Sequence, residues 1–157
     1  MKQRVYIDTS VIGGYYDQEF TEWSKSLFDD FNSGKRIAVL SDLTLDELRD
    51  APKRVKEILD TIPEESIEIL AIDNETRELA DKYISEKAVT EKYYEDALHI
   101  AIATISQVSV LSSWNFRHIV NLDKIRMYNA VNLKNGYSLL EIRTPREILN
   151  SEENENG

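Results

Sequence analysis

Residues 93–106 read YYEDALHIAIATIS, and this stretch gives the clearest indication of how the chain folds. From Ala97 to Ile105 nearly every side chain is apolar, which predicts a helix with almost no polar face. A helix of this kind is normally buried. The apolar run that follows, residues 108–111, has the length of a buried strand. A buried helix that leads into a buried strand is typical of an α/β protein.

Short apolar runs alternate with helical patterns on both sides of this stretch. The expected strands are residues 4–7, 37–40, 67–72, 108–111 and 139–142. The expected helices are residues 22–32, 45–61 with a break at Pro52, 73–84 with Asp73 as its cap, and 93–106, and Thr144–Glu147 has the spacing of a capping box at the start of another. This alternation predicts an α/β fold, a three-layer α/β/α sandwich around a mostly parallel five-stranded sheet.

The composition limits the class of protein. With 157 residues, of which 41% are hydrophobic, we expect a single domain over residues 1–150 and a disordered acidic tail over residues 151–157. The absence of cysteine excludes disulfides and thiolate metal sites, and no apolar run approaches the ~18 residues of a membrane span. We therefore expect a cytoplasmic protein without membrane contact. The formal net charge of −10 argues against nucleic acid as the partner, unless part of the acidity binds cations.

Three acidic residues fall where the predicted topology places a functional crevice, beyond the carboxyl ends of the strands. Asp8 directly follows the first strand, Glu47 lies early in the second helix, and Asp96 opens the apolar helix. Carboxylates that are crowded together repel one another unless a cation or a proton intervenes. Oxygen ligands suit Mg²⁺ or Mn²⁺, and such ions can activate a water for phosphodiester hydrolysis.

Each of these residues also has a structural interpretation. Asp8 could form a turn, Glu47 could close a capping box with Thr44, and Asp96 could cap its helix. Asn115, just past the fourth strand, could be an ordinary turn asparagine. Both sets of interpretations stay open at the level of sequence.

The chain resembles the PIN-domain family, and in particular the VapC-type toxin nucleases of toxin–antitoxin pairs. The resemblance rests on VYIDTS at residues 5–10, LTLDEL at 43–48 and YEDALHIAIA at 94–103. It implies a metal-dependent endoribonuclease that acts on RNA, with Mg²⁺ or Mn²⁺ as cofactor, an antitoxin partner and a homodimer. It implies metal ligation by Asp8, Glu47 and Asp96, with the Ser10 hydroxyl supporting the site.

The sequence departs from the family where a fourth acid is usual, because Asn115 stands at that position among the residues implied to be catalytic. An amide oxygen can ligate a metal but adds no charge, so the number of ions stays open. Two other functions remain as alternatives. One is a catalytically weak binding module, and the other is a phosphotransferase or dehalogenase-like hydrolase with Asp8 as nucleophile. The latter would want a second Asp where Ser10 stands. His99 is most simply a packed residue of a buried helix.

Overall fold

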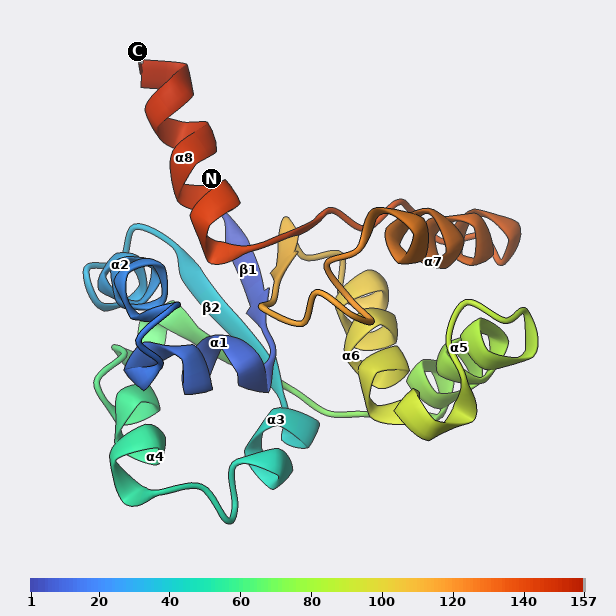
Figure 1. Ribbon diagram of the computed structural model, residues 1–157, viewed down its shortest axis with the longest axis horizontal. Coiled ribbons are helices and arrows are strands. Elements are labelled where there is room, and N and C mark those ends of the chain that lie inside the picture. The colour runs from blue at the N-terminus through green and yellow to red at the C-terminus, as the bar shows by residue number, and fades with distance from the viewer. Residues whose placement is uncertain (157) are drawn as a thin grey trace.

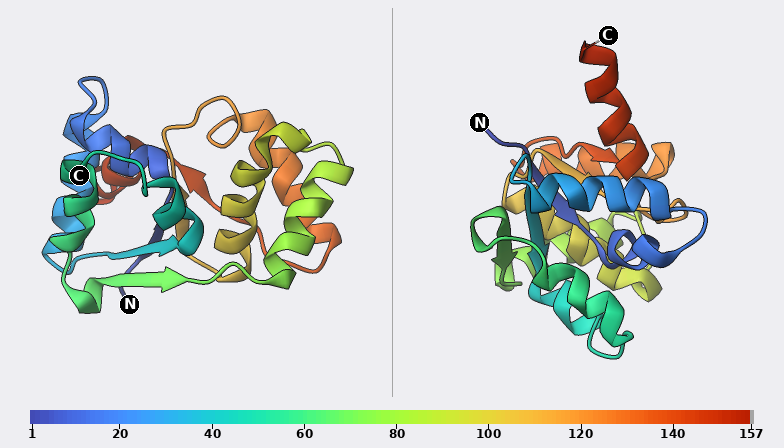
Figure 2. Two further views of the ribbon diagram at one scale, coloured as in Figure 1. Left: turned by 90° about the horizontal axis from the view of Figure 1, so that it is seen from below. Right: turned by 90° about the vertical axis from the view of Figure 1, so that its left-hand side faces the viewer.

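The chain forms a parallel sheet between two layers of helices (Figure 1; Figure 2, left). The structure is a computed structural model that describes the backbone of residues 1–156 and the side chains of residues 1–151. The elements in chain order are β1 (Arg4–Ile7), α1 (Thr9–Gly13), η1 (Gly14–Tyr16), α2 (Thr21–Asn32), β2 (Ile37–Ser41), α3 (Asp42–Glu47), α4 (Lys53–Asp60), η2 (Glu64–Ser66), β3 (Ile67–Leu70), α5 (Asn74–Ser85), η3 (Glu91–Tyr93), α6 (Tyr94–Ile105), β4 (Val110–Ser112), α7 (Leu122–Lys134), β5 (Ile142–Arg143) and α8 (Pro145–Asn156).

The sheet has the strand order β3-β2-β1-β4-β5, and every neighbouring pair is parallel. In the centre, Tyr6 of β1 pairs in register with Val39 of β2 and with Leu111 of β4. The chain leaves β1 towards β2 on one side and returns to β4 on the other, so the strand order reverses between β1 and β4. Ligands of parallel sheets bind at such a point, beyond the carboxyl ends of the strands.

Alternation along each strand supplies one core on each face of the sheet. Val5 and Ile7 of β1 face the helices α1, α2, α4 and α8, whereas Tyr6 between them faces α5, α6 and α7. Helix α6 lies in the middle of the second core, and its residues Ala97 to Ala103 are all buried. The apolar pattern of this helix therefore reflects its burial, as expected, and the predicted three-layer sandwich is confirmed.

Some elements differ from the sequence expectations. The helices α1 and α7 were not expected, and α3 begins at Asp42 instead of Leu45. Helix α7 lacks a clear apolar pattern because a polar residue, Asn132, occupies one of its buried positions. The Asn132 amide group is hydrogen-bonded there to Tyr83 and Thr104. The expected capping box at Thr144 is present, with Thr144 N donating to Glu147 Oε1 and Glu147 N donating to Thr144 Oγ1.

The last helix, α8, projects away from the two layers (Figures 1 and 2). It continues through Asn156, although the sequence predicts a disordered tail over residues 151–157. Each residue added to an existing helix orders one backbone unit and gains one backbone hydrogen bond. Residues 151–156 contain neither proline nor glycine, which would end the helix. Residue 157 and the side chains of residues 152–156 lie outside the described part. Within that part, no helix has both the length and the apolar character required to cross a membrane.

Candidate functional site

Asp8 lies at the reversal point of the sheet, directly after β1. Its carboxylate is buried, with 4% of the residue exposed. Oδ1 accepts hydrogen bonds from Ser10 Oγ at 2.6 Å and from Val11 N at 3.3 Å, so Asp8 is also the N-cap of α1. Oδ2 accepts from Ser113 Oγ at 2.5 Å. Burial raises the pKa of the Asp8 carboxyl, while His99 and the two serine hydroxyls oppose that shift.

Two serine hydroxyls fix the orientation of Asp8 from both sides of the reversal point. Ser10 Oγ, which donates to Asp8, accepts from Trp114 N at 2.8 Å. Ser113 Oγ, which also donates to Asp8, accepts from Asn115 N at 2.9 Å. Each hydroxyl therefore connects the carboxylate to the backbone that follows β4. Ser113 was missed at the level of sequence, although its place just after β4 puts it at the same edge as Asp8.

Asp96 is the third residue of α6, whose N-cap is Tyr93, and no side chain caps this helix. The interpretation of Asp96 as a cap is therefore wrong, because the helix starts three residues earlier than that role requires. Its Oδ1 accepts a hydrogen bond from Asn115 Nδ2 at 3.4 Å. Burial raises the pKa of the Asp96 carboxyl to about 6; repulsion from Asp8 and Glu47 adds to the shift, and His99 opposes it.

Asn115 connects Asp96 to the loop that follows β4. Its Oδ1 accepts from His118 N at 3.0 Å, and its backbone oxygen accepts from Ile119 N and Val120 N. The interpretation as a turn asparagine is thus correct, and its amide oxygen is engaged within the turn. The Nδ2 group remains directed at Asp96, so Asn115 has a place at the site as a hydrogen-bond donor to the acid.

Glu47 is the last residue of α3, and the N-cap of that helix is Ser41. The capping box with Thr44 is therefore wrong, because the helix begins before Thr44. Glu47 Oε1 instead lies 2.6 Å from His99 Nε2. The neighbouring acid Asp46 points away, is 65% exposed and pairs with Arg49. Of the two acids, only Glu47 is directed towards α6.

His99 holds Glu47 from within the core. The residue is 2% exposed, as a packed histidine should be, but both of its ring nitrogens are engaged. Nδ1 lies 2.6 Å from the Tyr6 hydroxyl, which lies 2.9 Å from Ser41 Oγ. If the Tyr6 hydroxyl donates to Nδ1, the neutral ring donates from Nε2 to Glu47. The sequence spacing could have indicated that His99 and Tyr6 lie at the site. His99 follows Asp96 by one helical turn, and Tyr6 precedes Asp8 by two residues and therefore points to the same face of the sheet.

The three carboxylates influence one another without forming a finished ligand set. Asp8 and Glu47 both raise the pKa of Asp96, so their charges act across the same edge of the sheet. Within residues 1–151, however, no three His, Asp or Glu side chains lie close enough as placed to hold one metal ion. Asp8 and Asp96 are connected through Ser113 and Asn115, whereas Glu47 belongs to the His99 chain of hydrogen bonds.

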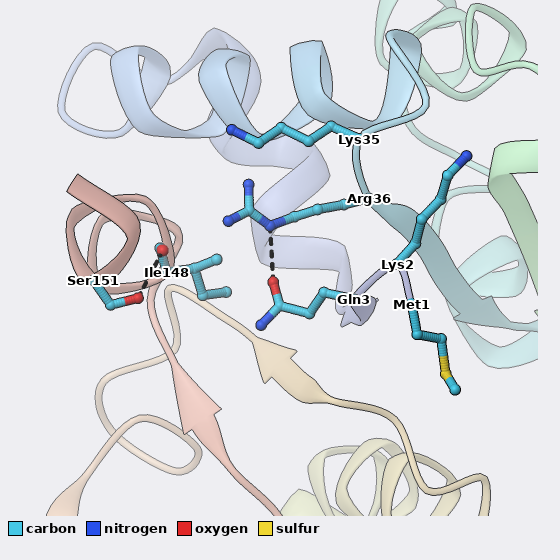
Figure 3. A pocket seen from close by; sticks show the side chains of 7 residues that line it. All are labelled: Met1, Lys2, Gln3, Lys35, Arg36, Ile148 and Ser151. Atoms are coloured by element: carbon cyan, nitrogen blue, oxygen red, sulfur yellow. Dashed lines mark hydrogen bonds between the residues drawn. The ribbon is translucent and has the colours of Figure 1, made fainter. Parts of the chain in front are cut away.

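Other charged regions have different surroundings. The basic residues of α4, Lys53, Arg54 and Lys56, are exposed to solvent, with the Lys53 side chain 90% exposed. A cavity of about 560 Å³ lies at the opposite, amino end of the sheet, lined by Lys2, Gln3, Arg36 and residues of α8. There the Arg36 guanidinium donates to Gln3 Oε1 at 2.8 Å (Figure 3). Arg36 also pairs with Asp30. This cavity is separate from the acidic edge.

Comparison with known proteins identifies the same fold. The family model described as "PIN domain" matches residues 5–120. VapC20 of Mycobacterium tuberculosis, described as a sarcin-ricin loop cleaving toxin, matches with a TM-score of 0.55 and 14% identity over 73% of this chain and 92% of its own. VapBC2 of Rickettsia felis, bound to a DNA fragment from its promoter, matches with a TM-score of 0.53 and 13% identity over 73% and 90%.

A third solved structure, FitAcB of Neisseria gonorrhoeae, matches with a TM-score of 0.51 and 16% identity over 90% of this chain and 97% of its own. Comparison with curated proteins gives no significant match. At these identities the structural likeness shows the fold alone. The family model, in contrast, covers most of the chain and contains all of the acidic edge described above. The chain therefore belongs to the PIN domain family.

Proposed function

We propose that this protein is a metal-dependent endoribonuclease that hydrolyses RNA phosphodiester bonds, and that it is the toxin of a toxin–antitoxin pair. The observation that carries the proposal is the pKa of Asp96, which burial and the nearby carboxylates raise to about 6. A buried acid beside other acids is relieved by binding a cation. Membership of the PIN domain family, with VapC20 and VapBC2 among the structural neighbours, supports a nuclease of this type.

The donor chemistry at the edge fits a divalent cation. Asp8, Glu47 and Asp96 would hold it, and they offer only carboxylate oxygens, which Mg²⁺ and Mn²⁺ prefer over nitrogen or sulfur. Magnesium commonly takes one or two carboxylates and keeps water and phosphate oxygens as its other ligands, so a complete cage is not required. Glu47 is 27% exposed, which leaves room for its side chain to turn towards Asp96.

The side chains around the carboxylates keep them in position. When bound, a divalent cation would supply polarisation of the scissile phosphate and an activated water. Ser10 and Ser113 hold Asp8 by donating to both of its oxygens, which favours the ionised form. His99 orients Glu47, and Asn115 donates to Asp96. Each carboxylate thus accepts at least one hydrogen bond from a neighbouring side chain.

An antitoxin partner is supported by VapBC2 among the neighbours. The homodimer and the cytoplasmic location remain predictions from the sequence. The binding-module alternative has two observations in its favour: the Asn115 amide oxygen is already engaged, and no three ligands are preassembled among the described residues.

The test is cleavage of total RNA and of hairpin RNA by purified, partner-free protein. We expect cleavage with Mg²⁺ or Mn²⁺, none in EDTA, and a loss of about 100-fold or more in Asp96→Asn. Asp46→Asn, which removes an exposed acid, serves as the matched control. Cleavage that persists unchanged in EDTA would overturn the metal mechanism. Metal binding without cleavage of any RNA would instead favour the binding module.

A further inference from the structure

A pocket of about 430 Å³ opens beside Asp96 at the start of α6. Its lining comes from five consecutive residues, Lys92, Tyr93, Tyr94, Glu95 and Asp96. The Tyr93 ring stacks against His118, which lies in the loop between β4 and α7, with ring centroids 3.6 Å apart and an interplanar angle of 30°. Two segments distant in the sequence therefore form one flat, partly exposed ring pair next to a proposed catalytic carboxylate.

Positive charge gathers around this ring pair, in a chain whose formal net charge is −10. Lys92 Nζ lies 5.6 Å from the centroid of the Tyr93 ring. Burial lowers the pKa of His118, and the positive charges of Arg117, Lys124 and Lys92 lower it further. Lys124 also donates to the backbone oxygen of Ala88 at 2.8 Å. The cations thus act on the same ring that stacks on Tyr93.

The ring pair is coupled to the acidic edge through Asn115. Asn115 Oδ1 accepts from His118 N at 3.0 Å, while its Nδ2 donates to Asp96. The Tyr128 hydroxyl donates to the His118 backbone oxygen at 2.8 Å and holds the loop from the other side. The position of His118 relative to Asp96 is therefore fixed by the fold.

We propose that Tyr93, His118, Lys92 and Arg117 form a subsite for an unpaired nucleotide of single-stranded RNA beside the scissile bond. This inference rests on the proposed nuclease function and names how that site takes its substrate. The base stacks on the ring pair, and a phosphate contacts Lys92 and Arg117. Glu95 lines the same pocket and directs phosphate to the Lys92 side by repulsion. The subsite provides local positive charge for the RNA phosphates, although the chain as a whole is acidic and repels RNA.

The test is binding of a short fluorescein-labelled single-stranded RNA, followed by anisotropy at increasing KCl in EDTA and at pH 8. EDTA stops metal-dependent cleavage, and pH 8 keeps His118 neutral. We expect Lys92→Ala to weaken binding and to reduce the slope of log K against log[salt] by about 0.7, the value for one lost phosphate contact. We expect His118→Ala to weaken binding about tenfold with an unchanged slope, whereas His118→Tyr restores stacking and affinity.

The matched control is Lys25→Ala on the opposite face of the sheet, where Lys25 Nζ lies 5.3 Å from the Tyr15 ring centroid. This variant should bind RNA like the parent. The proposal is overturned if the parent binds no RNA, or if Lys92→Ala and His118→Ala bind like Lys25→Ala. If that happens while the parent still cleaves RNA with Mg²⁺, only the subsite fails. If both variants lose affinity in a parent that cleaves no RNA, the nuclease assignment fails and the ring pair is an RNA-binding site without a scissile bond beside it, which overturns the subsite as proposed.

Discussion

The two ends of the sheet differ in how their charged side chains are arranged: opposite charges are paired at the amino end, and like charges lie near one another at the carboxyl end. At the amino end, Arg36 pairs with the carboxylate of Asp30, and Arg4 Nη2 lies 2.7 Å from Glu68 Oε1 (Figure 3 shows the surroundings of Arg36). At the carboxyl end, Asp8 and Asp96 both have a raised pKa, and Glu47 adds to the repulsion. Charges that are paired in place stabilise a fold, whereas like charges held together indicate a site that awaits a cation or a proton.

This difference predicts that substitutions at the two ends have opposite consequences. Loss of a charge at the carboxyl end should reduce activity with little cost in stability. Loss of a charge at the amino end should reduce stability with little effect on activity. The following predictions start with the largest expected effect.

The largest effect is expected for Glu47→Gln. Glutamine keeps an oxygen that can accept from His99 Nε2 but removes the negative charge, so cleavage of RNA should fall about 100-fold. The melting temperature of the metal-free protein should change little. Asp46→Asn is the control and should cleave like the parent. Full cleavage by Glu47→Gln would reduce Glu47 to a hydrogen-bonding partner of His99.

The amino end is tested by Arg36→Gln. The side chains of Arg36 and Asp30 are only 7% and 17% exposed, so the substitution leaves a poorly solvated carboxylate without its ion pair. The free energy of unfolding should fall by about 3 kcal/mol in denaturant titrations. Cleavage well below the melting temperature should be retained. A stable variant with impaired cleavage would mean that the two ends are not separate in function.

The stability of the metal-free protein should depend on pH through Asp96. Its pKa of about 6 lies above that of an unfolded aspartate, so the native state binds more protons between about pH 4 and 6. The free energy of unfolding should therefore fall as pH rises through this window, by about 1 to 2 kcal/mol after allowance for solvent screening. Asp96→Asn should flatten the curve. A parent that gains stability from pH 4 to 6 would contradict the assigned repulsion.

The smallest effect is expected for Asn115→Asp. An aspartate can keep the Oδ1 contact with His118 N, but it replaces the donor to Asp96 with a second negative charge. Calorimetry should show Mn²⁺ binding about threefold tighter, because the added charge is partly offset by the lost hydrogen bond. Equal or weaker affinity would indicate that the site requires the amide.

The fold could be predicted because apolar patterns report burial directly. The short apolar strands and the apolar helix α6 are stable in water only when other layers cover them, and the sandwich followed from their alternation. The carboxyl ends of the predicted strands then indicated where Asp8 should lie. The same method failed for α7, where the buried Asn132 interrupts the apolar pattern and depends on partners from other helices. A pattern in one segment cannot report such a partner.

The details of the acidic edge depended in the same way on contacts between distant segments. The interpretation of Glu47 as a cap failed because α3 begins at Asp42, and helix starts are poorly fixed by sequence. Its contact with His99 joins residues on α3 and α6. The stacking of Tyr93 on His118 likewise required the loop after β4 to be placed. Sequence spacing indicated which acids face the crevice but not what holds them.

The most direct test of a cation site at the carboxyl end is calorimetric titration of the parent and of Asp96→Asn with Mn²⁺ at pH 6. The titrations are made in two buffers of different ionisation enthalpy, which counts the protons released. A carboxyl with a pKa of about 6 is half protonated at this pH, so we expect the parent to release about half a proton per ion bound. Asp96→Asn should lose both the proton release and most of the affinity. Absence of Mn²⁺ binding, or equal binding by both proteins without proton release, would contradict a cation site built on Asp96.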